Sequence, residues 1–162
     1  MIIDGKKIAE EIKISLKEES ARLKKKLRLA VVYVGDDLGS QKFIEQKKKF
    51  GDEIGIEVTV SEFSQNISFD SLREEIKQLV RAPENTGLIV QLPLPPAINA
   101  RTVLDIVPPE KDPDMLSSRS VGNFAVGQSR IIPPVVGAVK MIFNKHEIDY
   151  KNKYTVIAGT GN

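Results

Sequence analysis

A lysine placed among apolar residues is the feature of this sequence with the clearest chemical use. Segment 40–54 reads as a helix, and four of its residues recur at helical spacing on one face: Phe43, Lys47, Phe50 and Ile54. An ammonium group held against apolar surface loses hydration of its charged form, which makes proton transfer near neutral pH feasible. The spacing leaves a second interpretation open, in which the lysine stem covers Phe43 and the charged end reaches water.

Other polar residues follow predicted strands. Gln91 lies at the end of the apolar run 87–92 and needs hydrogen-bond partners if it is buried, although a local bond to a loop backbone would satisfy it. Asp112 and Asp114 stand in a proline-rich loop, where they could bind a ligand or only cap a turn. The turn after the first apolar run brings Ser40 toward the same region.

Helices and strands alternate in the pattern that positions these residues. Apolar runs or alternation predict strands at 29–34, 56–60 and 87–92. Periodicity and capping residues predict helices from Asp4 to about Lys26, over 40–54 and 69–79, and briefly after Asn99. This order predicts an α/β fold with three layers, helix/parallel-sheet/helix, in which ligands bind outside the carboxyl ends of the strands.

Composition narrows the class of protein. The 24 basic and 22 acidic residues nearly cancel, which gives no strong field for nucleic acid or a membrane surface. There is no cysteine, and the one histidine, His146, is expected near a helix end, so we predict no metal site. No stretch is long and apolar enough for a membrane span, and we expect a cytoplasmic protein.

Several motifs in order carry a resemblance to a known family. The sequence is similar to the methylenetetrahydrofolate dehydrogenase/cyclohydrolase family in its segments 33–40, 90–95 and 109–114. The pair Phe43 and Lys47, the opening segment 3–6, Gly55-Ile56 and Asn123 agree with the same pattern. The resemblance covers nearly the whole chain.

The resemblance implies an enzyme of one-carbon metabolism that acts on tetrahydrofolate derivatives. Such an enzyme oxidises the methylene bridge with NADP and hydrolyses the methenyl product to the 10-formyl form. The resemblance implies that Lys47 is the acid/base group, that Gln91 orients it and that Asp114 holds the pterin end of the folate. Further residues expected to bind substrate are Ser40, Phe43, Leu92 and Pro93.

Three positions differ from the usual family pattern. Phe43 stands where tyrosine is usual, and Pro113 and Met115 replace valine and glycine beside Asp114. A bulky residue in place of glycine can change the direction of the Asp114 side chain, because glycine tolerates backbone angles that other residues do not. These differences keep an alternative open, a non-catalytic folate-binding or regulatory relative.

The end of the sequence predicts the start of a second domain. We divide the chain into a tetrahydrofolate-binding domain, 1–131, and the beginning of an NAD(P)-binding Rossmann-like domain, 132–162, with a helix at 135–143 and a strand at 154–158. Gly159, Thr160 and Gly161 would then begin the dinucleotide turn. That turn also needs a following helix, so we expect a truncated chain that binds NADP poorly or not at all. The resemblance implies a homodimer, and the missing part of the second domain keeps a monomer open as the alternative. A generic nucleotide-binding domain is a weaker interpretation.

Overall fold

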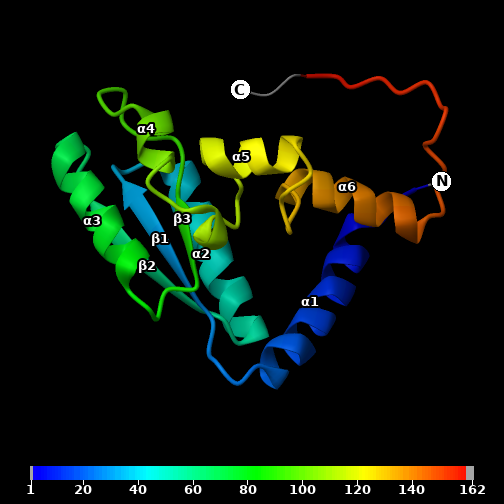
Figure 1. The fold of residues 1–162 in the computed structure, drawn as a ribbon. Coiled ribbons are helices and arrows are strands. Elements are labelled where there is room, and N and C mark those ends of the chain that lie inside the picture. Colours follow the sequence, from blue (N-terminus) through cyan, green and yellow to red (C-terminus); the bar gives the residue numbers. More distant parts are fainter. Residues whose placement is uncertain (1, 160–162) are drawn as a thin grey trace.

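A three-stranded parallel sheet forms the centre of the protein, as seen in the computed structural model, which describes residues 2–159 (Figure 1). Strand β1 (Arg28–Val34) lies in the middle, between β2 (Glu57–Phe63) and β3 (Gly87–Val90). Val32 of β1 is in register with Ser61 on one side and Val90 on the other. Parallel neighbours need crossover connections, and the helices between the strands provide them.

Helices cover both faces of the sheet, which explains why β1 is apolar from Leu29 to Val34, after the charged Arg28 at its start. On one face, helices α3 (Phe69–Arg81) and α4 (Ala100–Leu104) pack on Ala30, Val32 and Val34. On the other face, α2 (Leu38–Ile54) packs on the alternate residues of β1. The predicted three-layer α/β architecture is therefore confirmed, and alternation of side chains along the strand assigns each residue to one layer.

The first helix is shorter than predicted. Helix α1 (Gly5–Arg22) begins after Asp4, whose side chain caps it by accepting from the Lys7 amide. It was expected to continue to about Lys26, but Leu23 is already extended. The chain must turn back at that point to reach the start of β1, so packing of the sheet overrides the helical propensity of the lysine run.

The last helix lies against the first. Helix α6 (Pro134–Lys145) confirms the helix predicted at 135–143 and crosses the N-terminal part of α1, where Lys145 forms an ion pair with Glu11 (Figure 1). The strand predicted at 154–158 is wrong: residues 153–159 have no regular secondary structure. The side chains of Tyr154 and Ile157 are exposed, and within residues 2–159 no strand pairs with this segment, as a strand requires.

Two short elements precede α6. They are the 3-10 turn η1 (Pro109–Lys111) and helix α5 (Ser118–Ala125), and the sequence pattern had predicted neither.

Within residues 2–159, no helix combines the length and the apolar character needed to cross a membrane.

Candidate functional site

Helix α2 carries Lys47, and the face that it buries shares only Ile54 with the predicted one. The buried residues are Ser40, Ile44, Gly51 and Ile54. Phe43 is 59% exposed and Phe50 is 39% exposed, so these two residues of the predicted apolar stripe lie at the edge of the surface that α2 packs against the sheet. Gly51 decides this rotation, because its lack of a side chain lets α2 approach Val58 and the backbone of Ile56 closely.

The Lys47 side chain reaches the end of strand β3. It is partly buried, and its Nζ atom donates a hydrogen bond to Oε1 of Gln91 at 2.8 Å. Gln91 is itself held in place, because its backbone amide extends the sheet by donating to the Val32 carbonyl at 2.9 Å. The lysine therefore does not simply extend to bulk water, as the snorkelling interpretation required.

The carbonyl oxygen of Leu92 joins two of the predicted residues. It accepts a bond from Nε2 of Gln91 at 2.8 Å and another from Oγ of Ser40 at 3.2 Å. Ser40 is buried at the start of α2, where its amide donates to the capping carboxylate of Asp37. The local bond foreseen for Gln91 exists, but it coexists with the bond to Lys47 and fixes which end of the carboxamide faces the ammonium.

Asp114 is partly buried in the loop that follows η1. Burial raises the pKa of Asp114, and the nearby Asp112 carboxylate raises it further, whereas the Lys47 ammonium acts in the opposite direction. The net result is an Asp114 pKa above the ordinary value. A partly buried carboxyl group with a raised pKa is suited to proton transfer or to binding a heterocycle.

Asp112 has a structural role, one of the two outcomes foreseen for it. The buried carboxylate accepts hydrogen bonds from the amides of Leu116 and Ser117 and from Oγ of Ser120, at 2.6 to 3.2 Å. Burial alone would raise the pKa of Asp112, but these hydrogen bonds outweigh it and hold that pKa below its ordinary value. The residues of this cluster were not predicted, although Ser117 and Ser120 before an apolar helix face are a recognisable capping signal.

Met115 adopts the backbone conformation that glycine would adopt easily. Its φ is 54°, in the left-handed region, and its side chain is 4% exposed. Met115 therefore holds a left-handed turn after Asp114, with burial of the side chain offsetting part of the backbone strain.

The remaining predicted substrate-binding residues surround the same edge of the sheet. Leu92 lines a hollow of about 350 Å³ together with Met115, and Pro93 lines another of about 280 Å³ together with Gly35. Phe43 follows Ser40 by one helical turn and exposes its ring. Of the predicted cofactor residues, Gly159 lies in the exposed terminal segment with φ 95°, and Thr160 and Gly161 lie outside the described residues.

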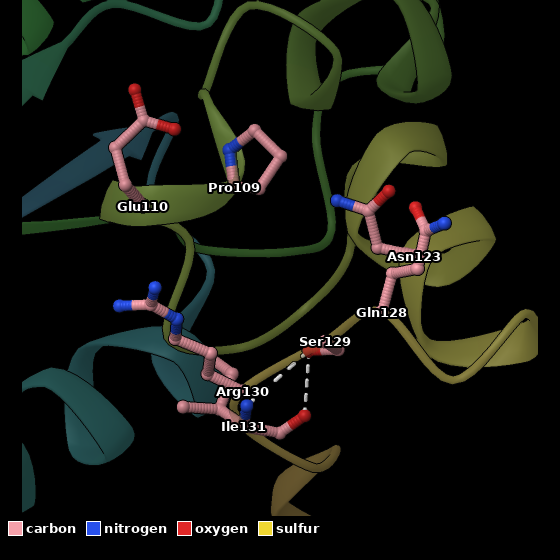
Figure 2. A pocket seen from close by; sticks show the side chains of 7 residues that line it. All are labelled: Pro109, Glu110, Asn123, Gln128, Ser129, Arg130 and Ile131. Atoms are coloured by element: carbon pink, nitrogen blue, oxygen red, sulfur yellow. Dashed lines mark hydrogen bonds between the residues drawn. The ribbon is translucent and has the colours of Figure 1, made fainter.

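A wider hollow, about 460 Å³, does not include the Lys47 group. Figure 2 shows it between η1 and the loop that follows α5, with the side chains of Glu110 and Arg130 on one side and the carboxamides of Asn123 and Gln128 on the other. Asn123, which agreed with the family pattern, therefore lies in this hollow.

The fold and the site together define an α/β protein with a lysine–carboxamide pair at the carboxyl ends of parallel strands and a partly buried carboxyl group, Asp114, in the loop after η1. The family model described as tetrahydrofolate dehydrogenase/cyclohydrolase, catalytic domain, matches residues 3–114. The chain belongs to this family, and the predicted membership is confirmed.

Relatives and solved structures agree with this assignment. The chain is 38% identical over 164 residues to the bifunctional protein FolD of Moorella thermoacetica, covering 99% of this chain and 59% of that protein. The crystal structure of the FolD enzyme of Campylobacter jejuni superposes with a TM-score of 0.86 at 33% identity, covering 90% of this chain and 53% of that one. A Trypanosoma brucei FolD structure, complexed with NADP and an inhibitor, superposes with a TM-score of 0.87 at 28% identity, covering 94% of this chain and 54% of that one. The chain thus spans little more than half the length of these proteins.

Proposed function

We propose that this chain carries the folate-binding and acid/base part of a methylenetetrahydrofolate dehydrogenase/methenyltetrahydrofolate cyclohydrolase. The observation that carries the proposal is the 2.8 Å hydrogen bond from Lys47 Nζ to Gln91 Oε1. The proposed substrates are one-carbon derivatives of tetrahydrofolate. The names of the relatives, which describe both activities, support the reaction class.

The hydrolytic step suits these residues. Water adds to the cationic methenyl carbon and loses a proton, and the bond from that carbon to one nitrogen then breaks as that nitrogen gains a proton. Lys47 is the proposed group that moves these protons, and Gln91 directs its Nζ atom without adding a charge. Asp114 is proposed to bind the amino-substituted ring of the pterin, and Phe43, Ser40, Leu92 and Pro93 to contact the folate around it.

NADP is the proposed cofactor of the dehydrogenase reaction, supported by the complex of the Trypanosoma brucei relative. A dinucleotide turn needs a strand before the glycines, and residues 153–159 are not a strand. The described residues therefore do not fit the cofactor by themselves, and we assign no step of hydride transfer to them. A cytoplasmic location is proposed from the sequence, and a homodimer is proposed on the basis of the family resemblance, with a monomer as the alternative.

The test is hydrolysis of methenyltetrahydrofolate, followed by loss of its absorbance, because this reaction needs no nicotinamide. We expect Lys47→Ala to lower the rate by roughly 10²- to 10⁴-fold, the usual effect of losing a general acid/base. Lys48→Ala is the matched control, since Lys48 is an exposed neighbour on α2. Wild type and Lys47→Ala chains that fold and hydrolyse at the same rate would contradict the proposal.

The alternative is a folate-binding or regulatory relative without catalysis, which is favoured by the phenylalanine at position 43. That chain would bind tetrahydrofolate, measured by calorimetry, and show no turnover that depends on Lys47. Binding and turnover therefore distinguish the two functions.

A further inference from the structure

The loop that carries Asp114 is attached to the fold at both ends. On the side before Asp114, Lys111 Nζ donates to the carbonyls of Val80 and Ala82, at 2.6 and 3.1 Å, which fastens the loop to the end of α3. On the side after it, Asp112 accepts the amides of Leu116 and Ser117 and so closes the loop around Pro113, Asp114 and Met115.

Asp112 is the centre of the second attachment. Its Oδ2 atom accepts from the Ser117 amide at 2.9 Å and from Ser120 Oγ at 2.6 Å, and the two serine hydroxyls are joined at 2.8 Å. Asp112, Ser117 and Ser120 are at most 5% exposed. A buried carboxylate with this many donors has one orientation, and a change in it must move the backbone on which Asp114 stands.

We propose that Asp112 is a positioning residue, which sets the position of Asp114 in its loop and thereby the affinity for the folate substrate. The inference rests on the proposed function. Asp112 touches no reacting group; it acts by holding the turn, including the left-handed backbone of Met115, in the one form that directs Asp114 to the site.

Asp105 offers a matched control. Its carboxylate also holds the start of α5, by accepting from the amide and the hydroxyl of Ser118 at 2.6 and 3.0 Å. It lies outside the segment 112–117 that contains Asp114. A role confined to stabilising α5 would make Asp105→Asn and Asp112→Asn equivalent, whereas positioning of Asp114 would separate them.

The experiment measures KM and kcat for methenyltetrahydrofolate, and the dissociation constant of tetrahydrofolate, in a double-mutant cycle. We expect Asp112→Asn to raise KM and the dissociation constant roughly tenfold with little change in kcat, because binding of substrate and transition state is weakened equally. Asp105→Asn should leave both KM and the dissociation constant unchanged. In the Asp114→Asn background, Asp112→Asn should have no further effect, because it acts through Asp114. Ser120→Ala, which removes one donor and keeps the carboxylate, should raise KM in the same direction by less.

Each outcome decides the inference. The positioning role is overturned if the effects of Asp112→Asn and Asp114→Asn on KM multiply in the double variant, or if Asp105→Asn raises KM as much as Asp112→Asn does. Either result leaves the proposed function standing. If Asp112→Asn fails to fold, an unchanged KM in Ser120→Ala overturns the role. A folded wild type that neither binds tetrahydrofolate nor hydrolyses the methenyl compound overturns the proposed function and this inference together.

Discussion

The ammonium of Lys47 and the carboxamide oxygen of Gln91 are 2.8 Å apart, although 44 residues separate them in the chain. Helix α2 supplies one and the end of β3 the other, on either side of β1. The parallel sheet makes this meeting possible, because both crossovers return the chain to the same edge.

Replacing Gln91 tests the use of this contact. A hydrogen bond to a charged group contributes about 1.5–3 kcal/mol, and each 1.4 kcal/mol is a factor of about ten. We therefore expect Gln91→Met to lower methenyltetrahydrofolate hydrolysis by roughly 10- to 100-fold. Gln46→Met, at an exposed position of α2, should leave the rate unchanged. A Gln91→Met enzyme as active as wild type would show that the orientation of Lys47 does not depend on Gln91.

The raised pKa of Asp114 predicts a stability penalty at neutral pH. Burial disfavours the ionised carboxylate, so the folded protein loses stability as the pH rises through the pKa of Asp114 in the folded state. Asp114→Asn has no such charge and should unfold at a higher urea concentration than wild type at pH 7. The difference should shrink as the pH falls below about 4, the ordinary pKa of the carboxyl group, because the group is then protonated in the unfolded chain as well. A less stable variant at pH 7 would contradict this assignment.

Asp112, two residues away, should have the opposite effect. Its pKa is lowered in the fold, so its contribution to stability is present above the ordinary carboxyl range and is lost as the pH falls through the folded pKa. From the hydrogen bonds removed, Asp112→Asn should lower the free energy of unfolding at pH 7 by about 2–4 kcal/mol. Urea unfolding of wild type and Asp112→Asn at pH 7 and at acid pH measures the difference in unfolding free energy and its pH dependence. If that difference does not become smaller at acid pH, the ionised carboxylate is not its source.

Gly51 should not accept a side chain. An added Cβ would lie 2.5 Å from the Val58 side chain and 2.7 Å from the Ile56 carbonyl oxygen, which belongs to the backbone and cannot rotate away. We expect Gly51→Ala to destabilise the fold by about 1–3 kcal/mol, as overpacking does. Gly122→Ala, also in a helix but with nothing within 4 Å, should be neutral or stabilise by up to about 1 kcal/mol. Thermal or urea unfolding of the two variants gives the comparison, and equal effects would exclude the close approach of α2 as the cause.

Met115→Gly changes stability in two opposing ways, because it relieves backbone strain and removes a buried side chain. Glycine would relieve about 1–2 kcal/mol of left-handed strain, whereas losing a buried methionine side chain costs about 2–5 kcal/mol with the cavity it leaves. We therefore expect a net loss of about 1–3 kcal/mol, although glycine is the usual residue of the family. A more stable glycine variant, measured by urea unfolding, would mean that the Met115 side chain is poorly packed.

The resemblance and the periodicity of the sequence predicted much of this protein. The continuous apolar character of segment 29–34 predicted a strand buried on both faces, because alternate residues must meet different layers. Asn99 predicted the start of α4, where it accepts from the Thr102 amide. Such features are local, so the sequence contains the necessary information.

Tertiary structure decided what depends on contacts between distant segments. The rotation of α2 follows from the close approach at Gly51, so the stripe containing Phe43 and Phe50 is more exposed than its spacing predicted. The pKa values of Asp112 and Asp114 shift in opposite directions although both stand in one short loop, because only the fold determines which carboxylate meets amide donors and which is buried without them. Spacing along the chain specifies residue types on a face, whereas burial and charge around each group are properties of the packed structure.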